Sequence, residues 1–175
     1  HRLRRLPCIR QGAQGPEAIG VCAGHAHRCD TGPMEEDLES RMTAIARRYG
    51  LESMYVFGSR AMEVVALLAG RQTSLAPGGS DVDIGVQPRR HLRLDAKERT
   101  GLTLELESLL GADRVDLVVL PEANALLAAE VVRGELLYTE DADAESESQL
   151  YYLRRAGDLA PFYKQQWKEL VGSEL

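Results

Sequence analysis

Three aspartates stand in two apolar segments, where an uncompensated charge is costly. Asp81 and Asp83 lie two residues apart in SDVDIGV, and Asp116 interrupts RVDLVVL. Because side chains alternate between the two faces of a strand, we expect the first two carboxylates to share a face while Val82 and Ile84 enter the core. If the two segments are neighbouring strands, all three carboxylates gather on one face of a sheet. They cannot stay charged together without cations, and oxygen ligands of this kind suit Mg²⁺ or Mn²⁺.

A Gly-Ser pair follows the apolar segment SMYVF. Gly58 at a strand-to-helix turn lets a phosphate group approach the backbone closely. We expect Ser59 to cap the next helix and to offer its hydroxyl to a phosphate oxygen, since a helix start favours an anion. Arg60 adds a charged contact for the same anion. A Gly-Ser pair alone is most often a plain helix cap, and Asp-x-Asp alone is often a strand end. Their combination with a third aspartate in another apolar segment is far more specific.

The remaining segments predict alternating helices and strands. Apolar residues at helical spacing and Gly or Pro breaks predict helices at 35–48, 59–68, 94–110 and 121–132, and strands at 53–57, 81–86, 114–120 and 135–138. The apolar stripe of the third helix consists of Leu102, Leu106, Leu109 and Leu110. Residues 71–80 read as a loop because they contain Pro-Gly-Gly. The order indicates a mixed α/β domain.

The C-terminal part begins with an acidic run, TEDADAESES, which we interpret as a solvated linker and helix start. An amphipathic segment rich in tyrosine and tryptophan follows, and Pro161 is expected to divide or kink it. One interpretation is a helix that packs on the sheet. The other is an arm that binds a partner, because exposed aromatic side chains often anchor interfaces.

Composition narrows the function classes. A formal net charge of −6 argues against a nucleic-acid-coating surface. No apolar run is long enough to predict a membrane span. All three cysteines lie within residues 1–33, and their absence elsewhere fits a reducing, cytoplasmic location. We expect residues 1–33 to be a disordered leader or a non-native upstream segment, with Met34 as the natural start. Four possible zinc ligands there, spaced too compactly for a zinc finger, are Cys22, His25, His27 and Cys29.

VFGSR, SDVDIGV and RVDLVVL together resemble the minimal nucleotidyltransferases of the DNA polymerase beta superfamily. The resemblance spans about residues 53–140. It implies an α/β (α+β) polymerase-beta-like fold, a small mixed sheet flanked by helices, with the domain at 34–140 and a helical extension at 141–175. Carried over by position, it implies that Gly58 and Ser59 hold the triphosphate of ATP.

The same resemblance implies a reaction. Asp81 and Asp83 would bind two Mg²⁺ ions, and Asp116 would bind the catalytic ion and help to deprotonate the attacking hydroxyl. The hydroxyl would attack the α-phosphate of a nucleoside triphosphate, and pyrophosphate would leave. One departure concerns residues 60–80, because family members usually have about ten residues between Gly-Ser and the first aspartate. The longer segment should leave the strands in place but reshape the pocket.

The residues do not identify the group that accepts the nucleotide. Small proteins similar to this family often act as antitoxins that transfer AMP to a tyrosine of a HEPN-domain RNase, which implies such a partner here. A second interpretation is transfer to a small molecule, as in aminoglycoside nucleotidyltransferases, with a homo-oligomer supplying the missing acceptor site. A third is a non-catalytic module that neutralises a partner by contact. The three intact aspartates speak against the last.

Overall fold

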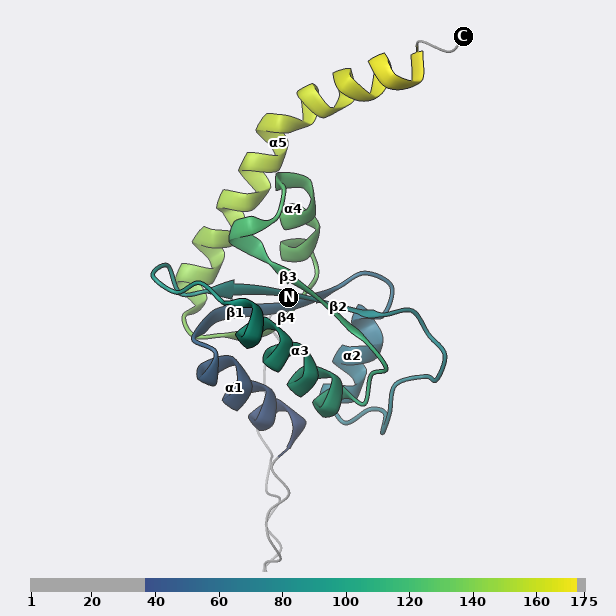
Figure 1. Cartoon of the computed structure of the whole chain (residues 1–175), viewed down its shortest axis with the longest axis vertical. Helices are drawn as coiled ribbons and strands as arrows, with labels where there is room; N and C mark the ends of the chain where they lie inside the picture. Colours follow the sequence, from purple (N-terminus) through teal and green to yellow (C-terminus); the bar gives the residue numbers. More distant parts are fainter. Residues whose placement is uncertain (1–36, 173–175) are drawn as a thin grey trace, which may run out of the picture. The chain divides into compact units, whose positions relative to one another are not determined.

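The computed structural model describes residues 37–172 (Figure 1). Expectations for residues 1–33, including the leader and the cysteine–histidine zinc motif, lie outside the described residues. The helices are α1 Leu38–Arg48, α2 Ala61–Leu68, α3 Ala96–Leu110, α4 Ala125–Arg133 and α5 Ala142–Gly172, with a 3-10 turn at Leu120–Glu122. The strands are β1 Leu51–Phe57, β2 Val82–Pro88, β3 Val115–Val119 and β4 Glu135–Thr139.

The four strands form one mixed sheet in the order β3-β2-β1-β4. β1 is antiparallel to both of its neighbours, whereas β2 and β3 are parallel. The α/β fold with a small mixed sheet flanked by helices, expected from the sequence, is confirmed. The two aspartate-bearing segments are also neighbours in this sheet, because β2 pairs directly with β3.

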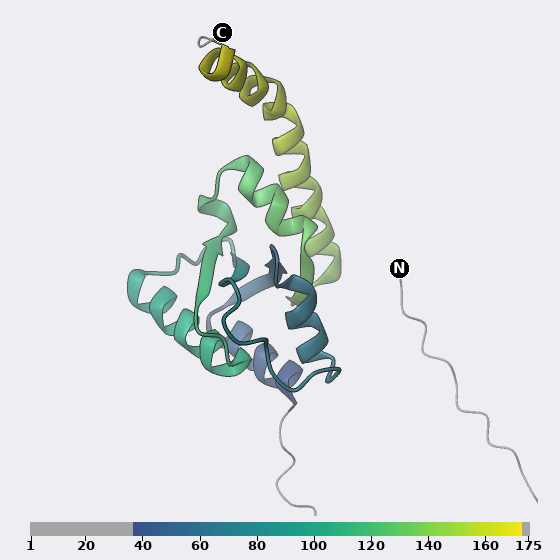
Figure 2. The same cartoon turned by 90° about the vertical axis from the view of Figure 1, so that its right-hand side faces the viewer.

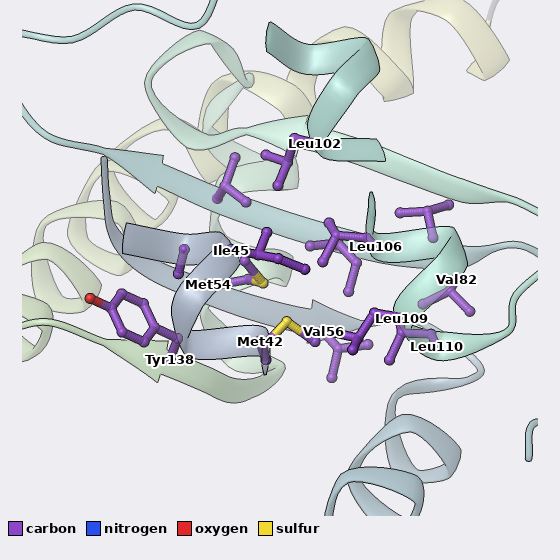
Figure 3. Packing of buried hydrophobic residues seen from close by; sticks show 14 of the residues in the cluster. Met42, Ile45, Met54, Val56, Val82, Leu102, Leu106, Leu109, Leu110 and Tyr138 are labelled. Carbon is purple, nitrogen blue, oxygen red and sulfur yellow. The ribbon is translucent and has the colours of Figure 1, made fainter. Parts of the chain in front are cut away.

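Helices cover both faces of the sheet. α1, α2 and α3 lie on one face and α4 and α5 on the other (Figure 1). The larger core cluster fills the first interface, where Met42 of α1 and Leu106 of α3 meet Val56 and Val82 of the sheet (Figure 3). The predicted inward residues of β2 and the whole predicted stripe of α3 are buried. Alternation along β2 therefore turns Asp83 toward the face that carries α4 and α5.

The second cluster lies between that face and the last two helices. Its members are Tyr55, Leu120, Ala128, Val131, Val132 and Tyr152. α4 approaches the sheet so closely that a Cβ atom at Gly85 would overlap the side chain of Val131. Gly85 is two residues from Asp83 along β2, so α4 covers β2 immediately beside the carboxylate.

The first half of α5 agrees with the interpretation of a helix that packs on the domain, whereas the partner-binding arm stays a prediction. This first half packs against α4 and buries Tyr152 and Ala156. Beyond it the helix continues past α4 and bends in both views (Figures 1 and 2). Pro161 lies inside the continuous helix and does not divide it. The removal of one backbone hydrogen bond by proline accounts for a bend without a break.

Several predicted helix starts are wrong. α2 begins at Ala61 with Arg60 in the cap position, and Ser59 does not cap it. Pro121 lies in the 3-10 turn, and α4 begins after Asn124, whose Oδ1 accepts from the Leu127 N–H at 2.9 Å. α1 likewise begins at Leu38, because Asp37 caps it. No helix within residues 37–172 has the length and apolar character to cross a membrane.

Candidate active site

Asp83 and Asp116 are paired in register across β2 and β3. Parallel neighbours at the same level place their side chains on the same face, so the two carboxylates stand side by side. Asp81 lies one residue before β2, two positions from Asp83. Burial, then the charges of Asp116 and Asp81, raise the pKa of Asp83 above its ordinary value. Each of the two other carboxylates therefore lies close enough to repel it.

The Arg114 guanidinium stands between the other two carboxylates. Its Nη2 lies 3.0 Å from Oδ1 of Asp116, and its Nε lies 3.4 Å from Oδ2 of Asp81. The Arg114 side chain is 65% exposed, and those of Asp81 and Asp116 are 41% and 47% exposed. These groups thus form an open, solvated site that a large acceptor could reach.

The donor set fits a divalent cation. Among the described residues, no group of three or more acidic, histidine or cysteine side chains is placed so that it could hold a metal ion by itself. Mg²⁺ does not require such a group, since it retains water and binds through one or two carboxylates together with substrate phosphates. Burial, and after it the repulsion by Asp116 and Asp81, raises the pKa of Asp83, and a nearby cation relieves such repulsion. Asp81, Asp83 and Asp116 therefore suit an ion that arrives with a nucleotide.

Gly58 forms the turn that follows β1, with a φ of 76°. A Cβ atom here would overlap Oδ2 of Asp83, so the carboxylate lies directly against the glycine Cα. Only glycine combines this left-handed backbone with so close a neighbour. The expected phosphate-binding turn and the expected metal-binding carboxylate are in contact, although they are 25 residues apart.

Ser59 and Arg60 contact the loop that precedes β2. The Ser59 Oγ lies 2.7 Å from the Ser80 Oγ, and both residues are exposed. The Arg60 side chain is only 10% exposed, and its guanidinium donates to Glu63, Ala76 and Ser80. The suggested contact of Arg60 with nucleotide stays a prediction, and these protein contacts already occupy its three nitrogens.

Three residues of the site were missed from the sequence. Ser80 and Arg114 are each close to a predicted aspartate in the chain, and Glu63 belongs to an i, i+3 pair with Arg60. The pair has a local signal, since residues three apart are neighbours on a helix. The other two have none that would separate them from ordinary surface residues.

The family model described as "Polymerase beta, Nucleotidyltransferase" matches residues 41–143. The chain belongs to this family. The matched residues span the sheet, most of α1, the whole of α2 to α4 and all six residues expected at the site. No match was found among curated proteins.

Several solved structures share the fold. A toxin–antitoxin structure with AMP-PNP is 24% identical, with a TM-score of 0.58 over 76% of this chain and 98% of the matched chain. A MntA–HpeT toxin–antitoxin mutant is 22% identical, with a TM-score of 0.59 over 76% of this chain and 98% of its own. A complex of a tri-AMPylated Shewanella oneidensis HEPN toxin with an MNT antitoxin is 22% identical, with a TM-score of 0.56 over 77% of this chain and 96% of the matched chain. At these identities the likeness concerns the fold.

Proposed function

We propose that the chain is a divalent-metal-dependent nucleotidyltransferase that moves AMP from ATP to a tyrosine hydroxyl of a HEPN-type toxin and so acts as its antitoxin. The in-register pair of Asp83 and Asp116, in contact with the Gly58 turn, carries the proposal. The family supports nucleotidyl transfer. Similar folds in structures described as a toxin–antitoxin with AMP-PNP and as a tri-AMPylated HEPN toxin with an MNT antitoxin support the nucleotide and the acceptor class.

Each residue has a defined task in this reaction. The turn at Gly58 and Ser59 would hold the triphosphate, and Asp81, Asp83 and Asp116 would hold two Mg²⁺ ions, with Mn²⁺ as a substitute. Such ions, when bound, would supply positive charge that stabilises the transition state of the transfer. Asp116 helps to take the proton of the acceptor hydroxyl, whose oxygen then bonds to the α-phosphorus. The bond from that phosphorus to the bridging oxygen breaks, and pyrophosphate leaves.

The open site favours a macromolecular acceptor. Asp81 and Asp116 are 41% and 47% exposed, so a loop or helix of a partner can reach them. The distal half of α5 adds an exposed aromatic surface formed by Phe162, Tyr163 and Trp167. Aromatic side chains on a protruding helix are suitable anchors for such a partner. We expect this surface to hold the toxin while its tyrosine enters the site.

The test uses the full chain, a purified HEPN-domain partner, ATP and Mg²⁺, followed by intact-mass measurement of the partner. Transfer should raise its mass by whole AMP units and should stop when the metal is chelated. Asp83→Asn should abolish the mass change but leave the complex intact, whereas Asp158→Asn on exposed α5 serves as the matched control. An unmodified partner that is still neutralised, equally by wild type and Asp83→Asn, would instead indicate inhibition by contact.

A further inference from the structure

The segment between α2 and β2 is fastened to the start of α2 by one ion pair. Arg60 Nε donates to Glu63 Oε2 at 2.8 Å. Its Nη2 donates to the Ala76 carbonyl at 2.9 Å and its Nη1 to the Ser80 carbonyl at 3.1 Å. One guanidinium thus binds the loop at two points, four residues apart.

Glu63 completes the attachment from the other side. Its Oε1 accepts from the Ala76 N–H, and its backbone carbonyl accepts from the Gln72 side chain at 2.9 Å. Gly79 lies flat against Arg60, since a Cβ there would come within 3.0 Å of the guanidinium carbon. Leu75 is buried in the core, which anchors the middle of the same loop.

Ser80 connects the anchored loop to the candidate active site. The carbonyl bound by Arg60 belongs to the residue that precedes Asp81, and the hydroxyl of the same residue lies 2.7 Å from the Ser59 hydroxyl. Two hydroxyl groups that are hydrogen-bonded to each other therefore stand next to the Gly58 turn, and each can donate to a ligand in place of this mutual bond. Both residues are exposed and can meet a ligand.

We infer that Arg60 is a positioning residue, paired with Glu63, that holds the loop so that Ser80 joins Ser59 as a second hydroxyl contact for the triphosphate. This inference rests on the proposed function. It assigns the long segment at 60–80 a role, because the added residues build and anchor one wall of the phosphate site. It also replaces a direct nucleotide contact by Arg60 with an indirect one through the loop.

Charge substitutions separate the two roles of Arg60. A direct contact predicts that Glu63→Gln leaves binding of AMP-PNP with Mg²⁺ unchanged or tightens it, because a nearby negative charge is removed. Positioning predicts that Arg60→Gln and Glu63→Gln each weaken that binding by about tenfold, since hydrogen bonds to charged groups are lost in both. The double variant should be no weaker than either single variant, because both remove the same attachment.

Two further variants complete the comparison. Arg60→Lys keeps the charge but carries its donors on a single nitrogen, which cannot reach the three separate acceptors, so positioning predicts weakened binding where a direct phosphate contact predicts little change. Ser80→Ala should weaken binding by about fivefold with no effect on the loop. The matched control is Glu130→Gln. It removes the carboxylate of a comparable ion pair on α4, in which Glu130 and Arg133 are three residues apart.

The experiment combines calorimetric titration of the full chain with hydrogen exchange of residues 71–80 without nucleotide. Arg60→Gln and Glu63→Gln should raise exchange in the loop about tenfold while thermal melting stays cooperative. Unchanged exchange in these variants, or AMP-PNP binding by Glu63→Gln as tight as wild type, would overturn the inference. If wild type bound no AMP-PNP, the proposed function and the role of Ser80 would both fail. Exchange alone would then decide whether Arg60 anchors the loop.

Discussion

The Cα of Gly58 lies directly against Oδ2 of Asp83, so the turn after β1 and the start of β2 are fitted to each other. Gly58→Ala introduces a methyl group that overlaps this oxygen and places a non-glycine residue at a φ of 76°. We expect the Asp83 carboxylate to be displaced and AMP transfer to fall at least about a hundredfold, because misplaced catalytic groups cost that much. Transfer kinetics of the variant check this prediction.

A second glycine of the chain separates the cost of a positive φ from the effect of the overlap with Asp83. Gly111, which follows α3, has a φ of 63°, and among the described residues other than its chain neighbours no heavy atom lies within 4 Å of the place that an added methyl group would occupy. Gly111→Ala should therefore lower the free energy of unfolding by about 1 kcal/mol and leave transfer nearly unchanged. Equal losses of transfer in both variants would mean that the contact with Asp83 does not matter.

The alternation along β2 was predictable because it depends only on local geometry. Val82 and Ile84 enter the core as expected, and Asp83 faces the other way for the same reason. The pairing of Asp83 with Asp116 needed one further fact, that β2 and β3 are neighbours, which is a property of the whole sheet. The sequence showed that the carboxylates would meet if the two strands were neighbours, but it did not show that the strands are neighbours.

The errors at helix starts arose where a second signal, distant for Ser59 and local for Pro121, competes with the first. Ser59 is a good helix cap by residue type, but its hydroxyl bonds to Ser80, which is separated from it by α2 and the whole loop. Pro121 suits a helix start by its φ, yet the same φ suits a 3-10 turn, and the side chain of Asn124 caps the helix that follows. The deciding contact of Ser59 is distant in the chain, whereas Asn124 offers a local cap signal that competes with the one of Pro121.

Arg114 bridges Asp81 and Asp116 and should compete with a divalent cation for them. Arg114→Ala removes this competitor, so we expect Mn²⁺ to bind about threefold more tightly, the size expected for an exposed ion pair. Spin-resonance titration of free Mn²⁺ measures the change without any turnover. Arg133→Ala, which breaks the similarly exposed pair with Glu130, is the control. Weaker Mn²⁺ binding by Arg114→Ala would contradict the prediction.

Tyr152 attaches α5 to the sheet through a buried hydrogen bond to Gln87 Oε1 at 2.8 Å. Burial, followed by the nearby Tyr151, raises the pKa of Tyr152 from 10.0 to about 12. Between these values the unfolded chain loses the phenolic proton and the folded chain keeps it. The contribution of this group to the free energy of unfolding should therefore be constant below pH 10.0 and fall by about 2 kcal/mol up to pH 12.

Urea unfolding of wild type and Tyr152→Phe through this pH range measures that contribution. The variant should be less stable by about 1 kcal/mol at neutral pH, since Gln87 loses its partner, and should show a smaller alkaline loss. The pKa of Tyr55 is also raised, mainly by burial, so a residual slope remains. Parallel curves for the two proteins would show that Tyr152 does not resist ionisation.

Trp167 is the only tryptophan of the chain, and its side chain is 69% exposed on the distal half of α5. Its fluorescence should be fully accessible to acrylamide in the free chain. Tyr163 lies four residues earlier, on the same side of the helix. If this surface docks the toxin, complex formation should protect Trp167 from the quencher and shift its emission to the blue.

Replacing Tyr163 and Trp167 by serine tests the same surface energetically. Because neither side chain is buried in the free chain, the free energy of unfolding should change by less than about 0.5 kcal/mol. Affinity for the partner should fall at least about thirtyfold, as expected when aromatic anchors are lost. Leu104→Ser on α3, 59% exposed, is the control for removing exposed apolar surface elsewhere. Undiminished affinity with Trp167 still open to quencher in the complex would place the toxin on another surface.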